Sequence, residues 1–346
     1  MKVMNTKPKI RCNRISYITI SLVMTGLLLT GCGRADTEES PAPVSQGDAY
    51  ISADPVSEGP ELSEDTGFPV HVEEVNVTVP GMKDKVKLAF LSDLHITVAD
   101  DEIEDGEKEN VNQRRESFAN EGMVSADQCQ EWMKILNDTK ADHVLLGGDL
   151  TDFASDANIK ILKKGLEKLT IPFMYIRADH DTEPFYLKDK DYEKCISLQK
   201  DLCEYQDVFV KEFPDFLIIG WNNSTIQLTA EGLEKINEAL ASKKPAILLT
   251  HVPIEPLSDK SLETASRDTF AGRSLLWGFG NNEEAPNEYT SKLLEMIYAD
   301  DTPFVEILAG HLHFSWDGNV SDKVHEHVFG PAFYGYMGII NISGED

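Results

Sequence analysis

Short apolar runs in this chain are followed directly by Asp or His, side chains that often hold metal ions. Residues 88–91 run into Asp93 and His95, and residues 144–146 run into two glycines and Asp149. The pattern recurs three more times along the chain. The Asp and His residues singled out after the five runs are Asp93, His95, Asp149, Asp152, Asp179, His180, His251, His311 and His313. Imidazole and carboxylate without thiolate suit Mn, Fe or Zn, so we expect a metal centre.

The apolar runs explain why these residues would meet. Runs that are apolar on both faces are typical of strands covered by helices, and their alternation with helical segments indicates an α/β fold. In such sheets, ligands bind beyond the carboxyl ends of the strands. The i, i+2 spacing of Asp93 with His95, and of His311 with His313, would place each pair on one side of an extended segment. Glycines before Asp149 and His311 allow a close backbone approach.

Four segments have the apolar spacing of amphipathic helices. They cover residues 132–136, 159–169, 233–240 and 289–296. Ser125 and Gln128 have the spacing of a capping box at the start of the first helix. Strand-like residues 70–79 and 86–91 flank a turn-like sequence, which predicts a hairpin. The strand-like tail, residues 324–342, predicts additional antiparallel strands.

The N-terminus has the features of an export signal. Five Lys or Arg residues precede an apolar run at 15–29, which is shorter than the roughly 20 residues of a membrane span. The run ends in Leu-Thr-Gly-Cys32, which resembles a bacterial lipobox and implies cleavage before Cys32 and a diacylglycerol on its sulfur. An ordinary secretory signal with a chance cysteine is the alternative reading.

These features divide the chain into three parts. Residues 1–31 are expected to be a lipoprotein signal peptide and residues 32–66 an acidic, disordered tether. Residues 67–346 are expected to be the folded domain. Such a protein would be lipid-anchored at the outer face of the bacterial cytoplasmic membrane.

Charge limits the partners of the mature chain. Removal of the expected signal peptide would take away five of the 32 basic residues. The mature chain would then have 27 basic and 60 acidic residues, a net charge of −33. This argues against nucleic acid as a partner and leaves the lipid anchor as the expected contact with the membrane. A small phosphate ester stays compatible, because bound cations reverse the local field. Cys195 and Cys203 could form a disulfide or be buried thiols.

The ordered set of motifs resembles the calcineurin-like metallophosphoesterase superfamily, over about residues 87–314. That pattern is D-x-H, G-D-x-x-D, G-N-H-[DE], a lone His and G-H-x-H, and it corresponds here to motifs at 93–95, 148–152, 178–181, 251 and 310–313. The resemblance implies a fold of two mixed β-sheets packed as a sandwich and flanked by helices, in four layers.

The resemblance also implies roles for these residues. One metal would be bound by Asp93, His95 and His313, and the other by Asp179, His251 and His311. Asp149 would bridge the two metals. His180 would protonate the leaving oxygen, and Asp152 would orient His180. Two divalent or trivalent ions (Mn, Fe or Zn) would supply a metal-bound hydroxide as the nucleophile. The expected function is hydrolysis of small phosphomonoesters or phosphodiesters.

The sequence departs from this pattern at residues 178 and 179, where Ala replaces Gly and Asp replaces Asn. The added negative charge lies beside an anionic substrate and would weaken the Lewis acidity of the second metal. An alternative function is therefore a catalytically weakened, metal-containing surface lipoprotein that binds a partner or a phosphorylated ligand. A solute-binding lipoprotein, suggested by the anchor, leaves the Asp and His set unexplained.

Other features have simpler expected explanations. The long stretch from His95 to Gly148 predicts an inserted lid or surface loop, and its acidic residues 100–109 predict a solvated loop. The short chain after His313 predicts minimal C-terminal strands. We expect His325 and His327 on the exposed face of a strand and His71 and His143 at the surface. The segment with Arg267, Arg273 and Trp277 is equally compatible with a substrate cleft and with a surface loop.

Overall fold

The computed structural model describes residues 67–202, 206–224, 227–279 and 285–345. The expected signal peptide, Cys32, the tether and Cys203 all lie outside these residues. Among the residues that are described, no helix is long and apolar enough to cross a membrane.

The first sheet has five strands in the order β1-β11-β2-β3-β4. Their bounds are His71–Thr78 (β1), Val86–Leu91 (β2), His143–Leu146 (β3), Phe173–Tyr175 (β4) and Tyr336–Ser343 (β11). β2, β3 and β4 are parallel neighbours, whereas β11 is parallel to β1 and antiparallel to β2. The sheet is therefore mixed.

The second sheet is also mixed, with six strands in the order β5-β6-β7-β8-β10-β9. Their bounds are Val208–Glu212 (β5), Leu217–Trp221 (β6), Ala246–Thr250 (β7), Phe304–Ala309 (β8), Trp316–Asn319 (β9) and His325–Val328 (β10). β6, β7, β8 and β10 are parallel, and β5 and β9 pair antiparallel at the two edges.

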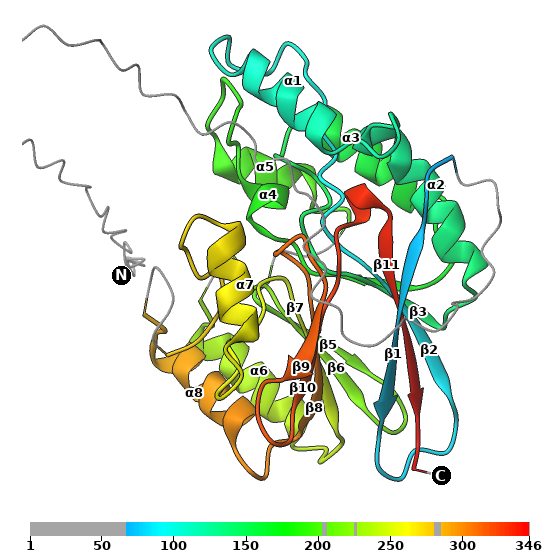
Figure 1. The fold of residues 1–346 in the computed structure, drawn as a ribbon, viewed down its shortest axis with the longest axis vertical. Helices are drawn as coiled ribbons and strands as arrows, with labels where there is room; N and C mark the ends of the chain where they lie inside the picture. The colour runs from blue at the N-terminus through cyan, green and yellow to red at the C-terminus, as the bar shows by residue number, and fades with distance from the viewer. Residues whose placement is uncertain (1–66, 203–205, 225–226, 280–284, 346) are drawn as a thin grey trace, which may run out of the picture. The chain divides into compact units, whose positions relative to one another are not determined.

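Helices cover the outer faces of both sheets and complete the expected four layers (Figure 1). The helices are Lys108–Ser117 (α1), Ser125–Asp138 (α2), Asp156–Leu166 (α3), Asp179–Thr182 (α4), Tyr192–Leu198 (α5), Ala230–Leu240 (α6), Ser261–Thr269 (α7), Glu288–Tyr298 (α8) and the 3-10 turn Ala332–Tyr334 (η1). α2 and α3 lie on the first sheet, and α6 and α8 on the second. These are the four helices that the periodicity predicts.

A continuous apolar layer joins the two sheets. It contains Val75 of β1, Phe90 of β2 and Ile340 of β11 from the first sheet, with Ile247 and Leu308 from the second. All five side chains are buried. Burial of such side chains contributes roughly 1.5–3 kcal/mol each, so this layer fixes how the strand ends of one sheet face those of the other.

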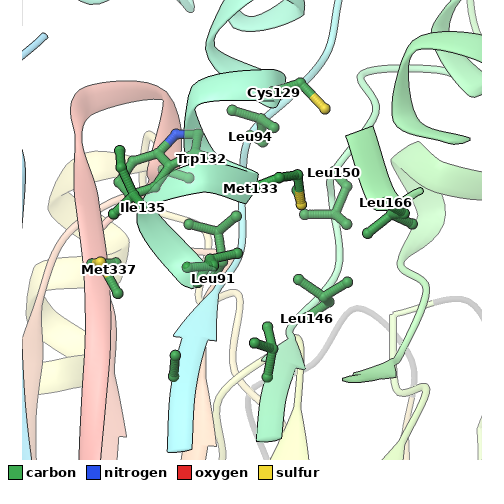
Figure 2. Close-up of a cluster of buried hydrophobic side chains, with 14 of the residues drawn as sticks. Leu91, Leu94, Cys129, Trp132, Met133, Ile135, Leu146, Leu150, Leu166 and Met337 are labelled. Carbon is green, nitrogen blue, oxygen red and sulfur yellow. The ribbon is translucent and has the colours of Figure 1, made fainter. Parts of the chain in front are cut away.

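α2 packs its apolar face onto the first sheet. Figure 2 shows its apolar face, including Trp132 and Met133, turned toward Leu91 and Leu146 on the sheet. On α3, a Cβ at Gly165 would lie 2.6 Å from the sulfur of Cys129, so glycine permits the two helices to pack this closely.

The predicted capping box is wrong. The N-cap of α2 is Val124, with no side-chain cap. Ser125 Oγ instead donates to the carbonyl oxygen of His95 at 2.7 Å, and Gln128 Nε2 donates to that of Met123 at 2.8 Å. The two side chains therefore hold neighbouring loops, including the backbone of a candidate metal ligand.

The predicted hairpin is also wrong, because β11 lies between β1 and β2. The ladder pairs β1 with β11 over the whole of both strands. The tail is thus not minimal: it adds the parallel partner of β1 as well as strands β9 and β10 of the second sheet.

The long stretch after His95 contains a helix, α1, that periodicity did not predict. Val111 is its one buried residue, so it lacks an apolar stripe. The acidic segment before it is not simply solvated: Ile103 is fully buried and bridges to Leu187. Cys195 is a buried free thiol whose sulfur donates to the carbonyl oxygen of Ala154.

Candidate metal centre

The candidate residues follow the carboxyl ends of β2, β3 and β4 in one sheet and of β7 and β8 in the other. Backbone hydrogen bonds join these loops. The amide of Asp93 donates to the carbonyl oxygen of Gly148 at 3.0 Å, and the amide of Gly310 donates to that of His251 at 3.1 Å. Across the two sheets, His311 N donates to both oxygens of Asp93 at 3.1–3.2 Å. The site is therefore assembled between the sheets.

Five of the candidate residues have a left-handed backbone, which is uncommon for any residue other than glycine. Their φ angles are 54° for Asp93, 49° for His95, 52° for Asp149, 73° for His311 and 56° for His313. Such conformations cost free energy and concentrate at functional sites. The expectation of extended segments is wrong here, because these residues have left-handed φ angles.

The side chains form three groups whose donor atoms lie within 4.8 Å of one another. The groups are Asp93 with His95 and His313, His95 with Asp149 and His180, and Asp149 with His251 and His311. Nε2 of His95 lies 3.2 Å from Nε2 of His313, and Nδ1 of His311 lies 3.2 Å from Nε2 of His251. Each group could hold a metal ion, and Asp149 is shared by two of them.

Two buried oxygens support the fit of this donor set to cations. Asp149 Oδ1 and Asp179 Oδ1 have no hydrogen-bond partner among the residues that the structure describes. Leaving a buried carboxylate oxygen unpaired is costly. A cation coordinated by these oxygens would remove that cost, so the residues fit a metal centre.

The charge states of three candidate ligands favour ligation. Burial alone would raise the pKa of Asp93, but its hydrogen bond with His313 and the charge of His251 hold the pKa at about 2. Burial lowers the pKa of His95 to about 4 and that of His311 to about 3. At neutral pH the carboxylate is therefore ionised and both imidazoles are neutral, which are the forms that bind metals. A fourth, His251, carries a proton at neutral pH, because nearby carboxylates, led by Asp149, overcome the effect of burial and raise its pKa to about 10.

His180 lies at the edge of the centre beside Asp152. Its Nδ1 lies 2.8 Å from the carbonyl oxygen of Asp152 and 3.3 Å from Oδ1 of the same residue. Burial opposes a charge on His180, but the nearby carboxylates, led by Asp149, raise its pKa to about 10. The structure thus places a proton-carrying imidazole next to the metal-ligand candidates.

Asp179 begins α4 and is not a member of the three donor groups. Its amide donates to Ser224 Oγ at 3.0 Å. Burial and the charge of Asp149 raise the pKa of its carboxyl group. At the neighbouring position, a Cβ on Gly148 would lie 2.9 Å from that of Ala178, and Gly148 has a φ of 96°. Glycine is therefore required at position 148.

Sequence reasoning missed several residues that support the centre. Asn223 Oδ1 accepts from the amides of His251 and Val252 at 3.1 and 2.9 Å, and its position after strand β6 was an available signal. The carboxylate of Asp181 accepts from the amides of Thr151 and Ala178 at 2.9 and 3.0 Å. Both side chains tie together loops that carry the candidate ligands.

The structure also places the histidines and the Arg- and Trp-containing segment that the sequence analysis did not assign to the metal centre. His71 is exposed as expected, whereas His143 is buried, contrary to expectation. Trp277 Nε1 donates to the carbonyl oxygen of Asn223 at 2.7 Å, which places its segment against the loop below His251. Arg267 donates to the carbonyl oxygen of Gly272 at 2.8 Å, within its own loop.

His325 and His327 do not lie on an exposed face. His325 contacts Glu306 at 2.9 Å and Asp317 at 3.0 Å, and His327 contacts Asp317 at 3.2 Å. Both side chains are mostly buried, because three adjacent strands present these residues on one face.

Residues 86–315 match the calcineurin-like phosphoesterase family, and the chain belongs to this family. It is accordingly a metal-dependent phosphoesterase, a hydrolase of phosphate esters. No curated protein matches the chain. The crystal structure of a dimetal phosphatase from Danio rerio is similar at 13% identity and a TM-score of 0.43, covering 72% of this chain and 89% of that chain.

Proposed function

We propose that the protein is a dinuclear hydrolase of small phosphomonoesters or phosphodiesters in which His180 protonates the leaving oxygen. One observation carries the proposal: Asp149 belongs to two donor groups, one with His95 and His180 at strand ends of the first sheet and one with His251 and His311 at strand ends of the second. A carboxylate in that position can bridge two cations.

The proposed ligands are members of these groups, with Asp179 added. Asp93, His95 and His313 would hold one ion, His251, His311 and Asp179 would hold the other, and Asp149 would bridge both. The donor set contains imidazole and carboxylate only, which suits Mn, Fe or Zn. When bound, two such ions would supply Lewis acidity toward the phosphoryl group and lower the pKa of water.

His180 is proposed to handle the leaving-group proton. Its Nδ1 is engaged by Asp152, which leaves Nε2 as the nitrogen that can donate to an ester oxygen. Breaking the P–O bond leaves negative charge on that oxygen, and transfer of the proton from His180 neutralises it. The imidazole becomes neutral in the same step, while Asp152 keeps its charge.

Hydrolysis assays with and without Mn²⁺ test this function. We expect metal-dependent hydrolysis of p-nitrophenyl phosphate or bis-p-nitrophenyl phosphate, and which ester is cleaved assigns the substrate class. Asp149→Ala and His251→Ala should abolish turnover, while the exposed His71→Ala should not change it. An unchanged rate in Asp149→Ala would contradict the proposed centre.

A second candidate function is a weakened enzyme that mainly binds a partner or a phosphorylated ligand. Asp179 favours it, because its carboxylate lies near Asp149 and its pKa is raised. Asp179→Asn removes the added charge, and a gain in turnover of tenfold or more, roughly 1.4 kcal/mol, would support this candidate. A loss of turnover would show that the aspartate serves the reaction.

We also propose that the mature chain is anchored through Cys32 at the outer face of the cytoplasmic membrane. The support is the sequence of the first 32 residues alone. Cys32→Ala should release the protein from the membrane fraction, because two acyl chains provide the anchoring. Continued membrane association of this variant would contradict the proposal.

A further inference from the structure

The inserted helix α1 delivers an arginine to the centre. Arg114 Nε donates to Asp152 Oδ2 at 2.8 Å, and Arg114 Nη2 donates to Asp152 Oδ1 at 2.5 Å. Asp152 is fully buried, and the Arg114 side chain is 28% exposed. A bidentate, charge-assisted pair of this kind fixes both the position and the plane of the carboxylate.

The carboxylate that Arg114 holds is shared with two imidazoles. Asp152 Oδ1 lies 3.1 Å from Nδ1 of His95 and 3.3 Å from Nδ1 of His180. The orientation of Asp152 therefore bears on a candidate metal ligand and on the proposed proton donor together. A rotation of this carboxylate would disturb both.

Arg114 is itself held by its surroundings. Its guanidinium carbon lies 5.1 Å from the ring centre of Phe118 and 5.5 Å from that of Tyr186. Phe118 stacks on His95, with ring centres 4.5 Å apart and planes 16° apart. The amide of Glu104 donates to the carbonyl oxygen of Tyr186 at 2.9 Å. The insertion is thus fastened to the segment that follows His180.

We propose that Arg114 is a positioning residue for hydrolysis: it fixes the plane of Asp152 and thereby aims His180 at the leaving oxygen. The inference rests on the proposed function. As the P–O bond breaks, His180 gives its proton to the departing oxygen and becomes neutral. Arg114 and Asp152 keep their protonation states throughout. The insertion therefore contributes to the chemistry of the site through a residue outside the family motifs.

The test compares esters with good and poor leaving groups, because a proton donor matters most for a poor one. Arg114→Met, Arg114→Lys and the exposed neighbour Arg115→Met are assayed at saturating Mn²⁺ on p-nitrophenyl and phenyl esters of the class that the wild type hydrolyses. Arg114→Met should lower kcat for the phenyl ester roughly 10- to 100-fold and for the p-nitrophenyl ester only a few-fold. Arg114→Lys keeps the positive charge but loses the pair of parallel N–H donors, so its loss of kcat should be intermediate between those of the wild type and Arg114→Met. Arg115→Met should match the wild type.

A purely structural role would lower kcat for both esters by the same factor, and that result would overturn the inference. Melting curves identify any unfolding of Arg114→Met, and Arg114→Lys then carries the comparison. In a His180→Ala background, Arg114→Met should not lower kcat for the phenyl ester more than it lowers kcat for the p-nitrophenyl ester. If it still lowers kcat selectively for the phenyl ester, to the same extent as in the wild type, the inference is overturned. If His180→Ala discriminates between the esters and Arg114→Met does not, the proposed proton donor stands and Arg114 alone is wrongly assigned. If neither variant discriminates, the proton donor and the inference both fail.

Discussion

The metal centre and a second cluster at strands β8, β9 and β10 contain the same residue types but pair them differently. The second cluster, here called the β10 cluster, consists of Glu73, Glu306, Asp317, His325 and His327. In the β10 cluster each imidazole nitrogen faces a carboxylate oxygen, at 2.9 to 3.9 Å. In the metal centre, pairs of imidazole nitrogens approach one another at 3.2 Å. Imidazoles face carboxylates in the metal centre too, as with His251 Nε2 and Asp149 Oδ2 at 3.1 Å, but only there do two imidazole nitrogens also oppose one another among the described residues of the two clusters, an arrangement that suits a cation between them.

The two clusters also differ in backbone conformation. The β10 cluster is built on regular strands, with His325 opposite Glu306 and His327 opposite Asp317 in the ladders. The centre is built on left-handed turns after the strands. Residue type alone therefore does not define a metal site; the turn that carries each side chain decides which atoms converge.

The largest effect should come from equivalent carboxylate deletions in the two clusters. Asp149→Ala should lower kcat roughly a thousandfold or more, because several kcal/mol of transition-state stabilisation depend on the bound cations. Asp317→Ala should leave kcat within a few-fold of the wild type. Steady-state assays on the two purified variants check this, and equal losses would erase the distinction between the clusters.

Metal removal should also separate the clusters. A chelator should lower the Tm of the wild type by several degrees, because bound ions stabilise the folded state. His327→Gln should show the same drop and the same metal content by elemental analysis. His251→Gln should contain less metal and show a smaller drop. Loss of metal from His327→Gln instead would place an ion in the β10 cluster.

The β10 cluster should affect stability in alkaline solution. The carboxylates of Asp317 and Glu306 overcome the effect of burial and raise the pKa of His325 to about 10. A raised pKa gives stabilisation that is complete below the unfolded-state value of about 6.5 and is lost as the pH rises through about 10. His325→Gln should therefore be destabilised by about 1 kcal/mol at pH 6, after allowance for solvent screening of a partly exposed pair, and by less at pH 10. Urea unfolding at both pH values measures the difference, and a pH-independent difference would count against the ion pairs.

A further effect on stability should come from Glu326, which lies between the two histidines in the sequence and whose side chain is fully buried. Its Oε1 accepts from the amide of Ile254 at 2.8 Å, and burial raises its pKa to about 8. The folded state therefore favours the protonated form, and this stabilisation is lost as the pH rises from about 4.5 through 8. Glu326→Gln should gain stability relative to the wild type between pH 6 and pH 9. An unchanged difference over that range would indicate that Glu326 stays ionised.

The sequence predicted those parts of the fold that have a local signal. The strands before Asp93 and Asp149 and the helix containing Trp132 were visible because apolar runs and helical spacing are short-range patterns. The pairing of β1 with β11 was not visible, because Val75 meets Ile340 across most of the domain. Local alternation and a turn suggested a hairpin that this distant strand prevents.

The candidate site was predictable to a similar extent. The ordered motifs identified residues that the structure brings together, such as His95, Asp149 and His251. Their left-handed backbone had no signal, since Asp and His do not mark such turns as glycine does. Arg114 was missed because α1 has almost no apolar periodicity, so nothing in its sequence showed which side faces the protein.

The position of β11 has a consequence for how the chain is completed. Each residue of β1 pairs with a residue of β11, from His71 with Tyr336 to Thr78 with Ser343. During synthesis, β1 therefore emerges early and has no partner until residues 336–343 have been added. Such distant pairing is slow to form and leaves strand edges open meanwhile. The first sheet therefore cannot close before β11 has been made.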